Sequence, residues 1–194
     1  MKKILLASLM LSAFAHANNA AWESNDNHIS FLSIKVNQQK NSITEQSAFT
    51  SSKAMLDKDG MFTLNIDLNS VKTNIDIRDQ RLKDWVFETA QFGTATVSGK
   101  VDADAVNKLA VGETLKLRQP LVLDIHGQKI NLQAELSVQR VADDKIMVNT
   151  LTPVILDTKD MKMEKGVMQL VEVMALSSIV EQVPVSFSGE FMRK

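Results

Sequence analysis

The clearest pattern along the chain is an alternation of apolar and polar residues with a period of two. It runs through residues 62–68, 95–101 and 130–138, where every second side chain is apolar or small. Such alternation is typical of β-strands that bury one face. Weaker apolar runs predict further strands, which cover residues 28–36, 43–56, 112–117, 121–125, 145–156 and 183–187.

Short polar turns separate these segments. Asp57–Gly60 leads directly into the first alternating strand, so it is predicted to be a hairpin turn in which Gly60 takes a positive φ. It does not match a calcium-binding EF-hand loop, which needs its glycine at the sixth position. His126-Gly127 is predicted to turn a second hairpin, and a short helix is predicted at 102–109. Short strands at regular intervals, with turn signals between them, indicate an antiparallel sandwich or barrel.

Another short helix is predicted to form a corner between two strands. Asp79 is well placed as its N-cap, because a carboxylate there accepts hydrogen bonds from the amides two or three residues later. We expect Asp79 to pair with Arg78, while a forked contact between Arg78 and a phosphate is the alternative. The spacing of Leu82, Trp85 and Val86 predicts a shared inward face.

The first residues have the three parts of a secretory signal peptide. Lys2-Lys3 gives a positive start, residues 4–14 are apolar, and Ala15-His16-Ala17 provides small residues at a cleavage site. The apolar run is too short to remain as a membrane-spanning helix. We therefore predict cleavage after Ala17, export to the periplasm, and a single mature domain over residues 18–194.

Charge and cysteine content narrow the classes of partner. Loss of Lys2 and Lys3 lowers the basic count from 22 to 20 against 23 acidic residues, a net charge of −3. That charge argues against nucleic acid, or an anionic lipid surface, as the main partner. The absence of cysteine excludes disulfides, thiolate metal sites and cysteine nucleophiles. No second apolar run has the length of a membrane span, which leaves transient contact with a membrane open.

Residues suited to catalysis are scarce. The mature chain keeps two histidines, His28 and His126, and neither lies in a recognisable catalytic motif. His126 precedes a glycine in a predicted hairpin turn, where a solvated side chain is the favoured interpretation. We therefore predict no enzymatic activity, no cofactor and no metal site. A hydrolase or isomerase that uses His28 or His126 is the weaker alternative.

The segment around the corner helix resembles a known family signature. Thr73, Arg78-Asp79, Leu82 and Phe87 match the pattern T-x-x-x-x-R-D-x-x-L…F of the YceI-like family. The resemblance extends over most of the mature chain, including the closing strand Val183–Phe187. This family consists of small secreted bacterial proteins that bind polyisoprenoid chains. The resemblance implies a mainly β fold, a single antiparallel lipocalin-like β-barrel of about eight strands with short helices.

Residues 166–176 break the strand pattern and predict the longest helix. The segment is apolar nearly all round, so it is either buried or covers something apolar. We expect it to lie across one mouth of the barrel, with Gly166 and Ser177-Ser178 allowing it to move. Flexible Met side chains suit surfaces that adapt to a ligand. Four methionines lie in or near this segment: Met161, Met163, Met168 and Met174. Ordinary core packing is an equally open interpretation of these side chains.

The apolar strand faces are expected to surround a lumen. In a barrel of about eight strands, such a lumen is either filled by side chains or holds one small ligand. The resemblance implies a polyisoprenoid there, either a polyprenyl lipid or a quinone tail. We therefore predict a periplasmic carrier or storage protein, as a monomer or a dimer. The alternative is a non-catalytic stress or interaction protein with a filled barrel. The residues predicted to line the lumen or its lid are Phe31, Phe62, Leu64, Ile66, Trp85, Phe87, Val97, Leu132, Leu136, Val167, Leu170, Val171, Met174 and Phe187.

Overall fold

The computed structural model describes residues 20–194, so the predicted signal peptide at residues 1–17 lies outside the described residues. The elements are, in chain order, β1 (Ala20–Val36), β2 (Ser42–Phe49), β3 (Ser52–Asp57), β4 (Met61–Asp67), the 3₁₀ turn η2 (Leu68–Ser70), β5 (Val71–Lys72), α1 (Asp76–Arg81), the π-helical turn η3 (Leu82–Val86), β6 (Thr94–Lys100), α2 (Ala103–Asn107), β7 (Thr114–Ile125), β8 (Gln128–Ala142), β9 (Lys145–Thr150), β10 (Val154–Asp157), α3 (Glu164–Val173), β11 (Ser178–Ile179) and β12 (Gln182–Arg193).

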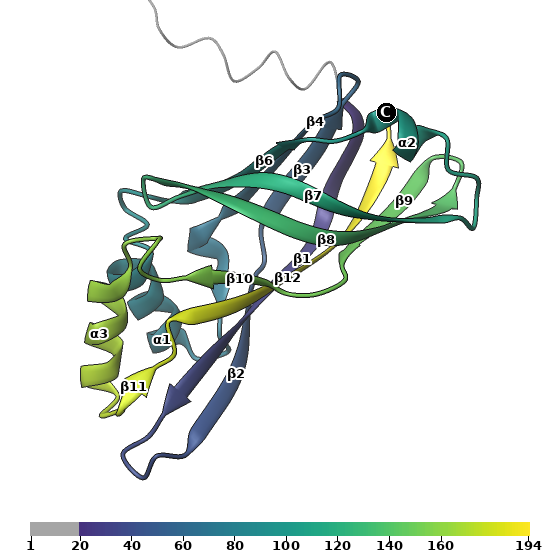
Figure 1. Cartoon of the computed structure of the whole chain (residues 1–194). Coiled ribbons are helices and arrows are strands. Elements are labelled where there is room, and N and C mark those ends of the chain that lie inside the picture. Colours follow the sequence, from purple (N-terminus) through teal and green to yellow (C-terminus); the bar gives the residue numbers. More distant parts are fainter. Residues whose placement is uncertain (1–19) are drawn as a thin grey trace, which may run out of the picture.

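Eight of these strands form a closed antiparallel barrel (Figure 1). Hydrogen-bonded pairing runs through β1, β3, β4, β6, β7, β8, β9 and β12, and the pairing of β12 with β1 closes the ring. The predicted lipocalin-like barrel of about eight strands is confirmed. Closure matters physically, because it gives every strand of the ring two neighbours and leaves no unpaired edge.

The alternating segments turn their apolar faces into this barrel. On β4, Leu64 and Ile66 are buried, while Asn65 between them is exposed. On β8, Ala134 and Val138 are buried in the same way. The period of two in the sequence therefore becomes an apolar interior surrounded by a polar outer surface.

Several strands differ in extent from the prediction. β1 begins at Ala20 and not at His28. The segment 43–56 is divided between two strands, β2 and β3, and the segment 145–156 between β9 and β10. By contrast, residues 114–125 form one continuous strand, β7. These differences have a common cause, because alternation marks which face is buried but not where a strand changes its partner.

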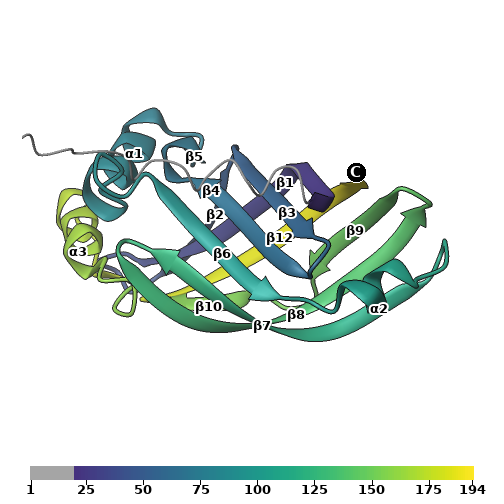
Figure 2. The same ribbon diagram turned by 90° about the horizontal axis from the view of Figure 1, so that it is seen from above.

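Two strands are long enough to have two sets of neighbours. The first half of β1 pairs with β3 and its second half with β2, while β12 pairs first with β10 and then with β9. Beyond the closed ring the sheet therefore continues as β10-β12-β1-β2-β5. Helices α1 and α3 gather at this end, which we call the helical end, and α2 lies at the opposite end, the α2 end (Figures 1 and 2).

Asp79 anchors the corner at the helical end, but not in the predicted way. α1 begins three residues before Asp79, and its N-cap Ile75 makes no side-chain hydrogen bond. Oδ1 of Asp79 accepts hydrogen bonds from the amide and the hydroxyl of Thr73, at 2.7 and 2.5 Å, and Oδ2 lies 3.3 Å from Lys72 Nζ. The predicted N-cap role and the predicted pairing with Arg78 are wrong, because Asp79 lies inside the helix and reaches back towards β5.

These contacts also control the ionisation of the buried carboxyl group. Burial raises the pKa of Asp79, but the hydrogen bonds from Thr73 and the ammonium of Lys72 outweigh burial and hold the pKa below its ordinary value. A carboxyl whose pKa is depressed by folding stabilises the protein above its unfolded-state pKa. That stability is lost as the pH falls through the folded-state pKa.

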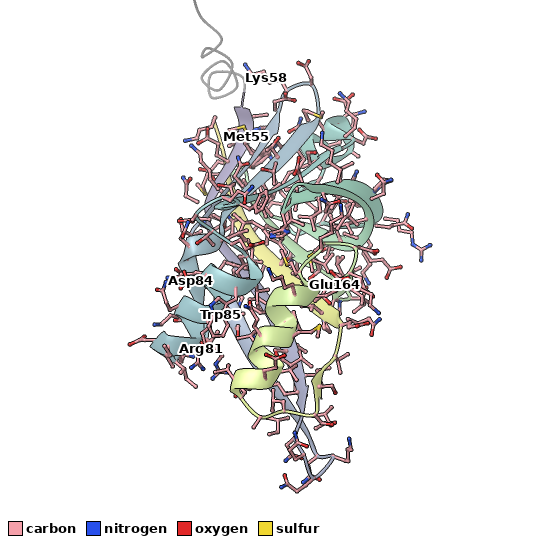
Figure 3. The ribbon with its side chains drawn as sticks, turned by 90° about the vertical axis from the view of Figure 1, so that its left-hand side faces the viewer. Met55, Lys58, Arg81, Asp84, Trp85 and Glu164 are labelled. Atoms are coloured by element: carbon pink, nitrogen blue, oxygen red, sulfur yellow. The ribbon has the colours of Figure 1, made fainter. Side chains whose placement is uncertain are left out.

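Close packing between α3 and η3 forms the other side of the helical end. A Cβ atom at Gly166, in α3, would overlap the carbonyl oxygen of Trp85 and lie 2.7 Å from Val86 Cα. Figure 3 faces this region and labels Trp85 on η3 and Glu164 at the start of α3. Gly166 is thus a point of close backbone contact, and its expected part in letting the helix move stays a prediction. The helix also runs from 164 to 173, earlier than the predicted 166–176.

We expect Asp79→Ala to lower the free energy of unfolding by about 2–3 kcal/mol near neutral pH, because two buried donors of Thr73 lose their acceptor. Asp76→Ala is the matched control, since Asp76 binds the same Lys72 but has a side chain that is 98% exposed. Its effect should stay below about 0.5 kcal/mol. Urea unfolding measures both, and the gap between wild type and Asp79→Ala should narrow in acid. Equal losses in the two variants would contradict the anchoring role.

Gly166→Ala tests the close packing of α3. Alanine favours a helix over glycine by about 1 kcal/mol. We nevertheless expect a net destabilisation of about 2–3 kcal/mol, because the new methyl group meets backbone atoms that cannot rotate away. Gln169→Ala, at an exposed position of the same helix, should change stability by less than about 0.5 kcal/mol. A Gly166→Ala protein that is more stable than wild type in urea would show that the contact is loose.

Candidate ligand-binding cavity

An apolar cavity of about 270 Å³ occupies the interior of the barrel and reaches the helical end. Among the described residues its wall contains no charged side chain. The polar side chains in the wall are few: Ser33, Gln119, Thr150, Thr158 and Ser186. Such a wall offers hydrophobic and dispersion contacts with little directional hydrogen bonding, so it suits an apolar ligand.

Eleven of the fourteen residues predicted for the lumen or its lid lie in this wall. Both the barrel strands and the helical end contribute to them, so segments far apart in the sequence meet around one cavity. That a ligand touches these side chains stays a prediction. The eleven are Phe31, Phe62, Leu64, Ile66, Phe87, Val97, Leu132, Leu136, Val167, Leu170 and Phe187.

Trp85 does not belong to the wall, although Leu82 and Val86 do. The reason is the π-helical turn, in which the amide of Phe87 donates to the carbonyl of Leu82 at 2.8 Å. A turn closed in this way contains more than four residues. Val86, four residues after Leu82, therefore stays near the same face as Leu82, whereas Trp85, three residues after it, points away from that face. The Trp85 ring packs against the hydrophobic core, as Leu82 does, and lies 5.5 Å from the guanidinium of Arg81. Trp85 therefore adjoins the core without lining the cavity.

Val171 and Met174 are also outside the wall, so the prediction that they face the lumen is wrong. The inward stripe of α3 consists of Val167 and Leu170. The helix ends at Val173, and Met174 at the C-cap has left the helical conformation. The early end of α3 accounts for Met174, whereas Val171 lies inside the helix on a face that does not reach the wall.

The methionines divide between the two interpretations left open by the sequence. Met161 and Met163 precede α3, are buried and lie in the cavity wall. Met168 is 61% exposed. Flexible thioether side chains therefore line one part of the helical end, where they can adapt to ligand shape or simply fill the core.

Several residues of the cavity wall, among them Trp22 and Phe191, were not predicted from the sequence. Trp22 is almost fully buried and lies in the wall, but the first strand was predicted to begin after it. Its indole Nε1 donates to Asn107 Oδ1 at 3.2 Å, which connects β1 to α2. Phe191 also lies in the wall, and extending the alternation of Val185 and Phe187 by two further steps would have found it.

The two histidines lie apart from the cavity wall. His28 is exposed on β1. His126 adopts a positive φ in the β7–β8 turn, but its side chain is only 9% exposed. Its Nε2 lies 2.7 Å from Glu88 Oε2, and its ring is 4.4 Å from that of Phe92. The expectation of a solvated His126 is wrong, because the residues between η3 and β6 fold over the hairpin turn and enclose the ring.

Two further observations concern the part of the chain from residue 20 onward. None of its helices has the length and apolar character needed to cross a bilayer. Its histidine and carboxylate side chains form no group of three or more that is arranged to hold a metal ion.

The closed eight-stranded antiparallel ring around an apolar cavity defines a lipocalin-like barrel protein. Within that class, the chain belongs to the YceI-like family, since the family model of the YceI-like domain matches residues 19–191. The resemblance inferred from the Arg78-Asp79 region is therefore confirmed.

Solved structures show the same fold. A polyisoprenoid binding domain from Saccharophagus degradans, implicated in plant cell wall breakdown, is 33% identical with a TM-score of 0.85, over 90% of this chain and 99% of that one. BcnA from Burkholderia cenocepacia is 16% identical with a TM-score of 0.59, over 86% and 98% of the two chains. No curated protein matches the sequence.

The position of α3 predicts different results for a carboxylate at two of its residues. Leu170→Asp places the charge in the apolar wall, so we expect it to lower the free energy of unfolding by about 3 kcal/mol or more. Met174→Asp lies outside the wall and should cost at most about 1 kcal/mol. Urea unfolding of the ligand-free protein measures both. A Met174→Asp loss as large as that of Leu170→Asp would contradict the described end of α3.

Proposed function

We propose that this protein binds a polyisoprenoid chain in its barrel cavity and acts as a periplasmic carrier or storage protein for that chain. The observation that carries the proposal is the cavity wall, which is predominantly apolar and contains no charged side chain among the described residues. Membership of the YceI-like family supports it, as does the likeness to a polyisoprenoid binding domain at 33% identity.

The physical reason for such a carrier is the insolubility of the ligand. Burial contributes about 0.8 kcal/mol for each CH₂ removed from water, or roughly 4 kcal/mol for a five-carbon isoprene unit. A flexible branched chain has few polar groups to position. A smooth apolar wall can therefore hold it without matching any particular hydrogen bond. The signal-peptide pattern at residues 1–17 supports export to an aqueous compartment where such a carrier is needed.

Native mass spectrometry of protein from the periplasmic fraction of its own host tests the proposal. We expect the mature chain to begin at Asn18 and to carry additional mass that extraction identifies as a prenyl lipid or a quinone. Protein that is found only in the cytoplasm, or that never carries lipid, would contradict the carrier function and favour a barrel that acts without a ligand.

A matched pair of variants on β7 tests whether the lipid occupies the cavity. Leu117 lies in the wall, whereas its neighbour Lys116 is exposed on the outer face of the strand. Leu117→Trp should reduce the amount of retained lipid by about tenfold by filling the cavity, with a stability change of less than about 1.5 kcal/mol. Lys116→Trp should retain lipid as wild type does. Equal retention in both variants would place the lipid elsewhere.

A further inference from the structure

The barrel wall contains a seam at which two neighbouring strands are not hydrogen-bonded to each other. β8 pairs with β7 from Gln128 onward but with β9 only from Leu136 onward, so its first half runs past the closed ring. Among the described residues, β10 pairs only with β12. β8 and β10 lie side by side near the helical end (Figure 1), and we call the line between them the β8–β10 seam.

A proline explains why the ladder between β8 and β9 does not continue into β10. The last bond of that ladder runs from the amide of Leu151 to the carbonyl of Glu135, at 2.7 Å. Alternate residues of a strand direct their backbone groups to the same side, so the next donor towards β8 would be residue 153, opposite Gln133. Residue 153 is a proline, which has no amide hydrogen, and from Val154 the chain follows β12 instead. The seam therefore begins at Pro153.

The seam lies between the cavity and the solvent. Leu132 of β8 and Val154 and Leu156 of β10 line the cavity wall. On the outside, Leu151 and Ile155 are 46% and 55% exposed. Apolar side chains are therefore present on both the inner and the outer side of the seam.

Neighbouring strands also diverge elsewhere in the wall, but hydrogen bonds bridge those places. Where β12 leaves β1, the amide of Val180 donates to the carbonyl of Ile34 at 2.8 Å, and β11 pairs with β1. Beside β6, Gln119 Nε2 of β7 donates to the carbonyl of Lys100 at 2.8 Å. After the bond from Leu151, no backbone hydrogen bond between described residues crosses the β8–β10 seam. The seam can therefore open by separating side chains, whereas parting two bonded strands leaves their backbone groups without partners.

We propose that the β8–β10 seam is the entrance of the cavity, through which an apolar chain passes sideways between Leu132 and Val154. The inference rests on the proposed function and adds the route by which the ligand enters. β10 keeps its hydrogen bonds to β12 while its side chains separate from those of β8. A chain lying along the seam contacts Leu151 and Ile155 before it reaches the wall, so its apolar surface leaves water in steps. Entry of this kind needs no end-on threading through the helical end.

Crosslinking across the seam tests this route, because the chain has no cysteine of its own. Continuing the register of Leu136 and Thr150 places Asn131 opposite Ile155, and both of these side chains are exposed. Asn131→Cys with Ile155→Cys is joined by a short bis-methanethiosulfonate reagent, which a reductant removes. Farnesol is then mixed with the delipidated protein, and the fluorescence of Trp22 in the cavity wall reports its uptake. We expect the crosslink to slow uptake about tenfold or more, and the reductant to restore the rate.

The control crosslink joins two strands that are already bonded. Asp124 of β7 and Lys129 of β8 are register partners with exposed side chains. Asp124→Cys with Lys129→Cys, treated in the same way, should take up farnesol within about twofold of the wild-type rate, because the ladder already holds these strands together.

The outcomes separate the entrance from the carrier function. Uptake at the wild-type rate by the protein crosslinked across the seam overturns the entrance and leaves the carrier function standing. Equal slowing by both crosslinks shows a general effect of crosslinking, which also overturns the entrance. Failure of the uncrosslinked wild type to bind farnesol or longer prenols contradicts the carrier function itself.

Hydrogen exchange of the wild-type protein gives a test that needs no variant. The amides of Asn131 and Gln133 face the seam, as the carbonyl of Glu135 does, while the amide of Leu132 faces β7. We expect the amides of Asn131 and Gln133 to exchange about tenfold or more faster than that of Leu132, as measured by NMR. Equal protection of the three amides would show that the seam is bonded, and it would overturn the inference.

Discussion

The pairing of β12 with β1 is the contact on which the structure depends, because it converts a sheet into a closed ring with an interior. Eight strands give an interior that side chains can fill or that can hold one small ligand. Here it is not filled, since small residues such as Ala95 and Ala134 occupy wall positions and leave about 270 Å³ empty. At about 24 cal/mol per Å³, an empty apolar cavity of this size costs on the order of 6 kcal/mol. A bound apolar chain would recover much of that cost, so an open interior is better explained by a ligand than by stability.

β1 and β12 extend past the closed ring of strands, and the helical end of the barrel lies around these extensions. Two local constraints hold this end together: the contacts of Asp79 with Thr73 and Lys72, and the backbone approach permitted by Gly166. Both tie helical segments to their neighbours through short contacts that have little room to adjust. α3 is consequently part of the cavity wall through Val167 and Leu170.

Period-two alternation predicted the barrel interior well, because the buried face of a strand is a local property of the sequence. Leu64, Val97 and Leu136 could be assigned to the cavity for that reason. The helical end was predicted poorly, because its geometry depends on contacts that no local pattern reveals. The misplacement of Trp85 came from a π-helical turn, and that of Met174 from a helix that ends one residue before it. Asp79 was assigned as an N-cap because its true partner, Thr73, lies six residues earlier, beyond the reach of a capping pattern.

Both ends of the barrel contain buried cations, and the two ends surround them differently. At the α2 end, Arg140 is buried with Nε and Nη1 lacking hydrogen-bond partners among the described residues. Its guanidinium lies 5.0 Å from the ring of Trp22, which belongs to the cavity wall while Arg140 does not. At that end the cavity wall therefore presents the ring of Trp22 and not the charge of Arg140. At the helical end, Lys35 of β1 and Arg78 of α1 both donate hydrogen bonds to Oε2 of Glu45 on β2, and Glu45 remains partly exposed. A buried ion pair contributes little net stability because desolvation offsets the attraction between its charges. These three side chains therefore determine how β1, β2 and α1 meet at the helical end more than they stabilise the fold.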